Sequence, residues 1–511
     1  MPKHALLVHG YSEQFLNAYG TFPDALKATA PELEQRIVLS AFDSLDDGVT
    51  IDDLARGLEQ QMQALEQMPA WDTSDAAVFC HSTGALVVRR WILNRLGSDA
   101  PLPTHLITLA GANHGSSLAQ LGRTALGYLH DEVFKRSATV GARVLIDLDY
   151  GSDFLFALNA DWLDWRFGER AKTDGRLQKM YVFSLGGDSL GRDTVVRAIW
   201  ASSERGCDNT VRISGANLNY TMLSGNPAQP GLVKKPRGLE PHLIVPAYSH
   251  YGPDTGIMAA CKTASDPPMR AIREALDVAD TGAYATLAAA WQARCGAWAD
   301  EPAAHANAAD PDYGGKPNRQ VHQNSTIVFR VRDWGGHTVD DCYIGLLDGS
   351  NMDASQPMAA ESFVERLLSM SDSLASRQPI HNDVARGSYT FYVNTDGFNA
   401  VHHLITIAAT EVGLCVPFVP VAYEYVPQAD GVRLVNANEV TYVDVEIWRD
   451  PSQSYAMYEN VPRPENEAAW RPFPPTGRIQ PPPSAPPQQQ QPPAPSSPPS
   501  PSPSSGGTTP A

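Results

Sequence analysis

At 511 residues the chain exceeds the length of one ordinary compact domain, so two domains are expected. Its 57 acidic residues outnumber 39 basic ones, and the net charge of -18 argues against a nucleic-acid partner and against broad adhesion to anionic membranes. Lipid contact would have to be local and apolar. The six cysteines are scattered without a CxxC pair, so neither a zinc cluster nor a dense disulfide framework is expected.

No apolar run reaches the ~18 residues that a membrane-spanning helix needs. The N-terminal segment MPKHALLVHGY has too short an apolar run for a signal peptide and is typical of a first strand. A cytoplasmic location is therefore favoured, and export without a cleaved signal stays open as an alternative.

Residues 1–258 alternate between short apolar strands and amphipathic helices, a pattern typical of an α/β domain with a mainly parallel central sheet. The expected strands are HALLVHG, RIVLSAF, AAVFC, HLITLAG, KMYVFSLGG and HLIVPA. The segment TIDDLARGLEQQMQALEQM has one apolar helical face, and Thr50 with Asp53 is a plausible capping pair at its start. Residues 115–179 interrupt the alternation, and we interpret this insertion as a lid or a fixed cap.

The chain changes character after residue 258. Residues 259–314 are predicted to form a helical connector followed by a linker. Residues 315–458 have a period of two with turn signals between the runs, which predicts an antiparallel β-sandwich of accessory role. Residues 459–511 are rich in Pro, Gln and Ser, so a disordered tail is expected; a flexible spacer is favoured over a ligand for an SH3-like partner.

The stretch CHSTG, residues 80–84, lies between a predicted strand and a predicted helix. A nucleophilic serine on such a turn needs small residues two positions before and two after it, because the turn brings them together. Gly84 meets this requirement, whereas Cys80 replaces the first glycine of the usual GxSxG pattern. The alternative interpretation is an ordinary strand-to-helix loop in which Ser82 caps the helix.

Three further stretches follow the order found in bacterial lipases. LLVHGY ends a strand in a His-Gly turn, LAGANHGSSLAQLG is similar to a T-x-H-x-G-S segment, and GSDFLFALN is similar to GS-x-FL-x-x-LN. With CHSTG, they make the first 258 residues resemble the lipase and esterase branch of the α/β-hydrolase superfamily. The resemblance covers about half of the chain.

This resemblance implies roles for residues around both turns. Ser82 would be the nucleophile, with His81 beside it in the turn. The backbone N–H groups of Tyr11 and Thr83 would form the oxyanion hole. The His9-Gly10 turn would support the first of these donors.

The base and the acid should follow the nucleophile in the order serine, acid, histidine. His250 lies just beyond HLIVPA, where this fold presents its catalytic imidazole. Asp208 is the favoured acid because DNTV matches the lipase pattern D-G-x-V, with Asn209 in place of a glycine; asparagine tolerates the left-handed conformation. Asp188, which follows the preceding strand closely, is the alternative acid.

The predicted activity is hydrolysis of carboxylic esters, by a lipase, esterase or phospholipase, through an acyl-enzyme on Ser82 and without metal or organic cofactor. The substrate would be a small-molecule or lipid ester, with transient contact to a lipid interface. Preference for esters rests on the resemblance alone. The alternatives are an amidase, thioesterase or polyester depolymerase on the same triad, or an inactive hydrolase fold used as a binding module. A fragment ending near residue 300 is expected to keep turnover of a small ester.

Overall fold

The computed structural model describes residues 1–11, 19–33, 37–116, 119, 141–191, 206–229, 231–301, 309–310, 316–317, 319, 321–340, 342–348, 380–381, 387–395, 403–409, 418–427 and 431–449. All of them belong to one compact unit, Met1–Pro462. The predicted tail lies outside the described residues.

The elements up to the connector are β1 (His4–Val8), α1 (Phe22–Thr29), β2 (Ile37–Leu39), α2 (Ile51–Glu66), β3 (Ala76–His81), α3 (Gly84–Leu96), β4 (His105–Leu109), α6 (Ala142–Leu148), α7 (Asp153–Phe167), β5 (Tyr181–Gly187), α9 (Ile213–Ala216), β6 (Tyr220–Gly225), β7 (Val233–Lys234), β8 (His242–Val245), α10 (Pro267–Leu276) and α11 (Thr281–Ala299). The later strands are β9 (Ala309–Asp310), β10 (Lys316–Pro317), β11 (Asn324–Asp333), β12 (Cys342–Asp348), β13 (Ile380–His381), β14 (Ser388–Asn394), β15 (His403–Ala409), β16 (Val421–Tyr425) and β17 (Val440–Ile447).

The first sheet has the strand order β2-β1-β3-β4-β5-β8, and every pair in it is parallel. Its strands are those that the six apolar runs predicted, so the α/β fold class is confirmed. Strands β1, β3, β4 and β5 are buried along their whole length, as strands covered on both faces must be. The carboxyl ends of these parallel strands meet at one edge, where the loops that follow them can converge.

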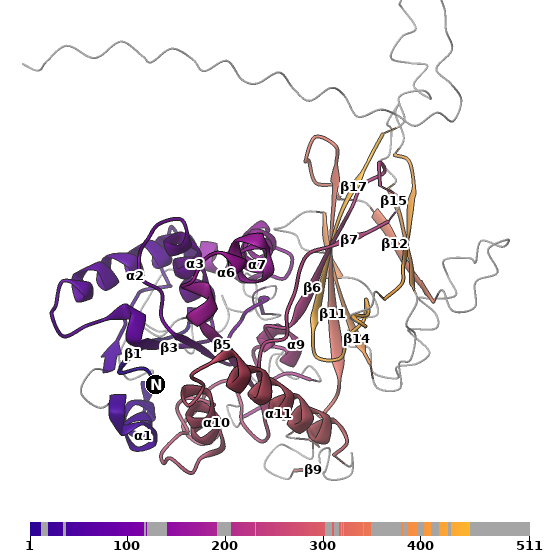
Figure 1. Ribbon diagram of the computed structural model, residues 1–511. Helices are drawn as coiled ribbons and strands as arrows, with labels where there is room; N and C mark the ends of the chain where they lie inside the picture. Colours follow the sequence, from indigo (N-terminus) through magenta and orange to yellow (C-terminus); the bar gives the residue numbers. More distant parts are fainter. Residues whose placement is uncertain are drawn as a thin grey trace, which may run out of the picture. The chain divides into compact units, whose positions relative to one another are not determined.

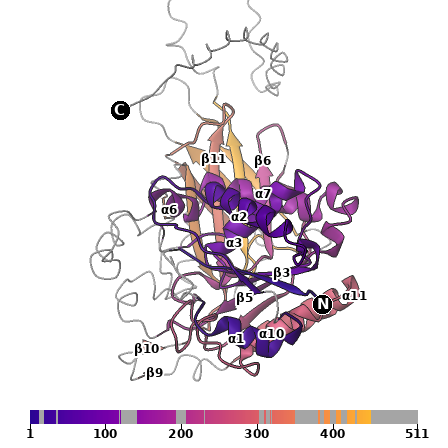
Figure 2. The same ribbon diagram turned by 90° about the vertical axis from the view of Figure 1, so that its left-hand side faces the viewer.

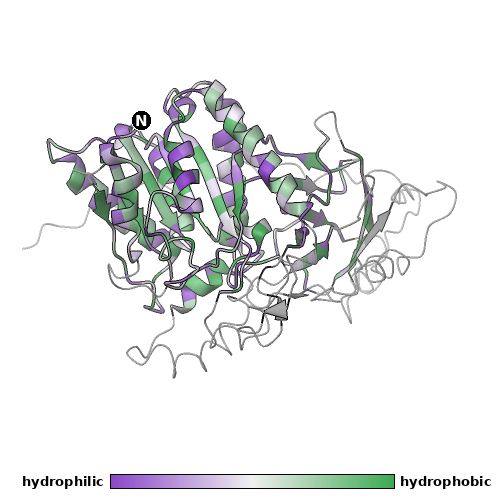
Figure 3. Ribbon diagram, turned by 90° about the horizontal axis from the view of Figure 1, so that it is seen from below, coloured by the Kyte–Doolittle hydropathy of each residue, from purple (hydrophilic) through white to green (hydrophobic). Residues whose placement is uncertain are grey.

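Helices cover both faces of this sheet (Figures 1 and 2). Alternate residues of β1 enter different cores: Leu6 and Val8 pack with α2, α3, α6 and α7, whereas Ala5 and Leu7 pack with α1, α10 and α11. In Figure 3 the strands of the first sheet are coloured largely as hydrophobic, whereas the surrounding helices carry both colours. Burial on two faces therefore fixes the register of each strand.

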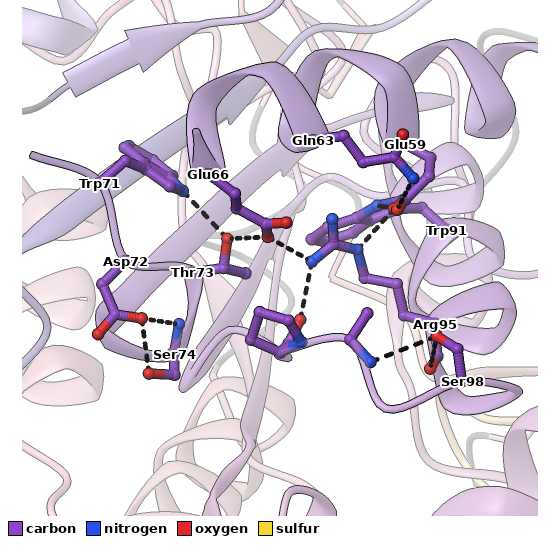
Figure 4. Close-up of polar contacts among 12 residues, drawn as sticks. Glu59, Gln63, Glu66, Trp71, Asp72, Thr73, Ser74, Trp91, Arg95 and Ser98 are labelled. Carbon is purple, nitrogen blue, oxygen red and sulfur yellow. Dashed lines mark hydrogen bonds and ion pairs between the residues drawn. The ribbon is translucent and has the colours of Figure 1, made fainter. Parts of the chain in front are cut away.

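A partly buried ion-pair cluster holds α3 against α2 (Figure 4). The guanidinium of Arg95 donates to Glu59 and to Glu66, each at 2.6 Å. Trp91 on the same helix also donates to Glu59, at 2.6 Å. Because the Arg95 side chain is only 1% exposed, these contacts are screened little by solvent and fix how α3 lies on its neighbour.

The capping pair predicted for α2 is confirmed, since Thr50 and Asp53 form a reciprocal capping box. In the predicted 115–179 insertion, the described helices α6 and α7 bury apolar side chains in the same core as α3. These two helices therefore pack as part of this core, and a cap role for them stays a prediction. Residues 117–118 and 120–140 lie outside the described residues, so a lid formed by them stays a prediction.

The second part of the chain builds two sheets. The smaller one, β12-β15-β16, is antiparallel as predicted. The larger one, β13-β14-β11-β17-β6-β7, which we call the second sheet, is mixed, because β17 pairs in parallel with both β11 and β6.

Strands β6 and β7 come from the segment that was predicted to belong to the first domain, and no sequence pattern predicted either strand. The chain therefore crosses from the first sheet to the second before β8 completes the first.

Among the described helices, none combines the length and apolarity needed to cross a membrane.

Candidate active site

Ser82 lies on a sharp turn, the serine elbow (residues 80–84), between β3 and α3. Its φ is +54°, a left-handed conformation that a non-glycine residue rarely adopts. A Cβ added at Gly84 would lie 2.4 Å from the backbone oxygen of His9. The small residue predicted at this position is thus required, because the turn presses against the end of β1.

Two other small residues shape the elbow. A Cβ on Gly10 would lie 2.7 Å from the Cβ of Ser82, so a larger residue there would displace the serine. The buried Cys80 thiol lies 3.8 Å from the carbonyl oxygen of Ile107 on the adjacent strand β4. The unusual cysteine is accommodated in the apolar core on one face of the sheet.

Ser82, His250 and Asp208 form a continuous hydrogen-bonded row. The Ser82 Oγ lies 2.9 Å from His250 Nε2, and the His250 Nδ1 lies 3.1 Å from Asp208 Oδ2. Because a carboxylate can only accept, the proton sits on Nδ1 and leaves the Nε2 lone pair facing the Ser82 hydroxyl. All three residues are buried, and Ser82 is the most accessible at 8%.

The acid loop, which we define as residues 206–219, fixes the carboxylate of Asp208. Its Oδ1 accepts from the backbone N–H groups of Thr210 and Val211, at 3.1 and 2.8 Å. The backbone oxygen of Asp208 also accepts from the His250 N–H at 2.8 Å. Asn209 has a φ of +89°, which confirms the left-handed conformation expected at the position of the lipase glycine.

The alternative acid, Asp188, contacts other partners instead of His250. Its Oδ1 accepts from the Ala247 N–H at 2.7 Å. Its Oδ2 accepts from Trp298 at 2.8 Å and from Arg319 at 2.7 Å. Asp188 therefore ties α11 and the start of the second part of the chain to β5, and it is not the acid that the structure brings to His250.

The two predicted oxyanion donors differ in what the structure says of them. Thr83 immediately precedes α3, and its N–H donates to no acceptor among the described residues. Positive partial charge at a helix N-terminus would add to its attraction for an oxyanion. Tyr11 follows the His9-Gly10 turn and adjoins residues outside the described part, so its role stays a prediction. His9 is buried, and its Nε2 accepts from the Phe42 N–H at 3.0 Å.

His81 contacts the loop that carries His250. Its Nε2 lies 2.9 Å from the His250 carbonyl oxygen, and the two rings are 4.8 Å apart. Since a carbonyl only accepts, Nε2 must donate, and the buried Nδ1 keeps a lone pair with no partner among the described residues. Burial lowers the pKa of His81 to about 3, so its imidazole is neutral at physiological pH.

One contact was missed although its sequence stretch was recognised. Ser116, in the lipase-like GANHGSS segment, donates from Oγ to the Thr210 carbonyl oxygen at 2.6 Å. The loop after β4 is thereby tied to the acid loop. The resemblance of the stretch was the available signal, but the partner lies too far along the chain for any local pattern to indicate it.

Among the described residues, no group of three or more His, Cys, Asp or Glu side chains is arranged so that it could hold a metal ion. The cysteines Cys80, Cys261 and Cys295 are free thiols.

Comparison with known proteins gives similarity at the level of structure. No family model and no curated protein matches the sequence. The chain is similar to phospholipase PlaB from Legionella pneumophila, with 24% sequence identity over 91% of this chain and 97% of that chain, and a TM-score of 0.73. PlaB in complex with thio-NAD gives 24% identity over 90% and 97% of the two chains, and a TM-score of 0.71. These likenesses show that the chain has the α/β-hydrolase fold of that phospholipase.

Proposed function

We propose that the protein is a serine hydrolase that cleaves carboxylic esters of lipid-like substrates through an acyl-enzyme on Ser82. The observation that carries the proposal is the buried row from Ser82 through His250 to Asp208. Nucleophile, base and orienting acid in hydrogen-bond contact are what acyl transfer requires. The positive φ of Ser82 adds support, because strain of this kind gathers at functional sites.

In the proposed mechanism, His250 accepts the Ser82 proton as the serine oxygen attacks the ester carbonyl. Asp208 holds the imidazole in the required tautomer and stabilises the imidazolium. The N–H groups of Thr83 and Tyr11 receive the oxyanion, each contributing ~3 kcal/mol to the transition state. His250 then protonates the leaving alcohol, and water, activated by the same imidazole, releases the acid.

The substrate class rests on two supports. The similarity to a phospholipase favours a lipid ester over an amide. The net charge of -18 disfavours recruitment by electrostatic attraction to anionic lipid, so contact with a lipid surface should be apolar and little affected by salt. The rival proposal, an inactive hydrolase fold used as a binding module, predicts no turnover at all.

The experiment compares turnover of short-chain and long-chain p-nitrophenyl esters and of phosphatidylcholine vesicles. Ser82→Ala should abolish all of it. Asp208→Asn should lower kcat by about 10⁴-fold, as loss of the orienting acid does in serine hydrolases. Asp188→Asn is the matched control: it should lower thermal stability, because it weakens a buried contact to Arg319, while kcat is kept. Turnover that survives Ser82→Ala unchanged would refute the proposal.

A further inference from the structure

The acid loop lies between the two sheets. Its short helix α9 packs against β5 of the first sheet and against β11 of the second (Figure 1). Asp208 precedes this helix by a few residues, on a segment with little regular structure of its own. The position of the Asp208 carboxylate therefore depends on the residues of both sheets that contact the acid loop.

Strand β14 of the second sheet reaches the backbone just before Asp208. The Tyr392 hydroxyl donates to the Gly206 carbonyl oxygen at 3.2 Å. Gly206 has a φ of +70°, and a Cβ there would lie 2.3 Å from the Asn324 side-chain nitrogen and 2.8 Å from the Tyr392 hydroxyl. The second sheet thus approaches the loop so closely that only glycine fits.

A second set of contacts lies just after Asp208. The Arg212 guanidinium is 4.0 Å from the centre of the Tyr392 ring and 4.7 Å from that of Tyr150, an arrangement typical of cation–π attraction. Two residues further on, the Ser214 hydroxyl lies 2.8 Å from the Thr326 hydroxyl on β11. Tyr392 therefore contacts the loop on both sides of the acid.

The far end of the loop is held by β17. The Tyr442 hydroxyl lies 3.1 Å from His114 Nδ1, and His114 Nε2 lies 2.9 Å from the Asn217 carbonyl oxygen. Burial keeps the pKa of His114 well below its usual range, so the ring is neutral. The ring then donates a hydrogen bond from Nε2 to the Asn217 carbonyl oxygen and accepts one at Nδ1 from the Tyr442 hydroxyl.

We propose that the second sheet is part of the catalytic apparatus, with Tyr392 as a positioning residue that sets Asp208 against His250. The proposal rests on the proposed function. Asp208 takes its other hydrogen bonds from Thr210 and Val211 within the loop, so the carboxylate moves wherever the loop moves. A shift of ~1 Å at a reacting group can lower a rate by about 10²-fold.

The test uses the full chain with Tyr392→Leu and Tyr392→Phe. Tyr392→Leu removes both the hydrogen bond and the ring below Arg212, and it should lower kcat 10- to 100-fold with KM changed less than about twofold. Tyr392→Phe keeps the ring and should lower kcat about threefold. Tyr389→Phe is the matched control, because this tyrosine lies on the same strand but donates to Asp340 and not to the acid loop; its kcat should equal that of the parent.

A double mutant separates positioning from general damage. In an Asp208→Asn background, Tyr392→Leu should lower kcat by less than about twofold, because a residue that acts through Asp208 has nothing left to act on. Losses that simply multiply, or a change in KM alone, would overturn the proposal. If Tyr392→Leu does not fold, Tyr392→Phe decides it: a kcat equal to that of the Tyr389→Phe control would overturn it.

A spectroscopic readout distinguishes failure of this proposal from failure of the proposed function. The His250 Nδ1 proton, hydrogen-bonded to Asp208, should give a downfield proton NMR signal that His250→Gln removes. Tyr392→Leu should weaken or shift this signal, and Tyr389→Phe should leave it in place. If the parent protein hydrolyses no ester, the proposed function fails, yet this signal still decides whether Tyr392 positions Asp208.

Discussion

The serine elbow and the acid loop reach the same imidazole by different means. Within the elbow, Ser82 is shaped by a strand, a turn and a helix that follow one another directly, and by β1, a direct neighbour in the sheet. Within the acid loop, Asp208 is held by strands that lie more than a hundred residues later in the sequence, through Thr326, Tyr392 and Tyr442.

This difference separates two kinds of structural information. The elbow is specified by steric exclusion, because only glycine fits at positions 10 and 84. A short sequence motif expresses such a requirement directly. The acid loop is specified by hydrogen bonds to residues that are distant in the sequence, such as Thr326 and Tyr392, and no short motif expresses them. Substitutions in the elbow should therefore act through backbone clashes, and substitutions behind the acid loop through misplacement of the carboxylate.

The largest effect is expected from removal of residues 315–511. Strand β6 would lose its partner β17, so both its edge and the apolar side chain of Leu223, which packs in the core of the second part of the chain, would be exposed. We expect an aggregated fragment without turnover, contrary to the activity that the sequence pattern suggested for such a fragment. Size-exclusion chromatography, circular dichroism and small-ester turnover measure this outcome.

The matched control is removal of residues 463–511 alone. All described residues belong to the unit Met1–Pro462, so solubility and turnover should equal those of the full chain. A monodisperse 1–314 fragment with full activity would show that the acid loop needs no second sheet.

The next largest effect is expected from Gly84→Val, which tests the elbow. The added Cβ would lie 2.4 Å from the backbone oxygen of His9, and a rotamer change cannot relieve this clash. The free energy of unfolding should therefore fall by roughly 3 kcal/mol or more. Gly57→Ala is the control: no atom lies within 4 Å of its added Cβ, and in helix α2 it should stabilise by about 0.5–1 kcal/mol. Similar thermal midpoints for the two variants would contradict the steric account.

A smaller effect is expected from acid through His81. Its folded pKa of about 3 lies below the unfolded value near 6.5, so between these pH values the unfolded chain binds more protons. Its contribution to stability is therefore complete above pH 6.5 and falls by at most about 1.4 kcal/mol per unit as the pH drops toward 3. His81→Gln can keep a donor to the His250 carbonyl without titrating, so urea unfolding of this variant should show a shallower pH dependence; an unchanged dependence would exclude His81 as a contributor.

The smallest effect is expected at the start of α2, away from both regions. Thr50→Ala removes one half of the capping box and should lower the free energy of unfolding by about 1 kcal/mol. The kcat should stay at the parental value, because this cap contacts neither the elbow nor the acid loop. A loss of kcat here would show that general destabilisation is enough to impair the site.

Local patterns allowed much of the first sheet and the elbow to be predicted. Continuous apolar runs marked strands buried on both faces, and CHSTG marked the turn at Ser82. They did not reveal β6, because NYTMLSG is short and its register partners, from Val440 onward, are remote in sequence. They could only rank Asp208 above Asp188, since the contact that engages Asp188 comes from Arg319 in the second part of the chain.

The parallel pairing of β6 with β17 also orders events during synthesis of the chain. All six strands of the first sheet have been synthesised once β8 leaves the ribosome, so the core around Ser82 can form at that stage. Strand β17 is synthesised much later, so β6 has no partner on that side until then. Non-local parallel pairings of this kind also form slowly. A nascent chain would thus have its serine elbow in place long before Asp208 is fixed, and the proposed hydrolytic activity would begin only after β17 has left the ribosome.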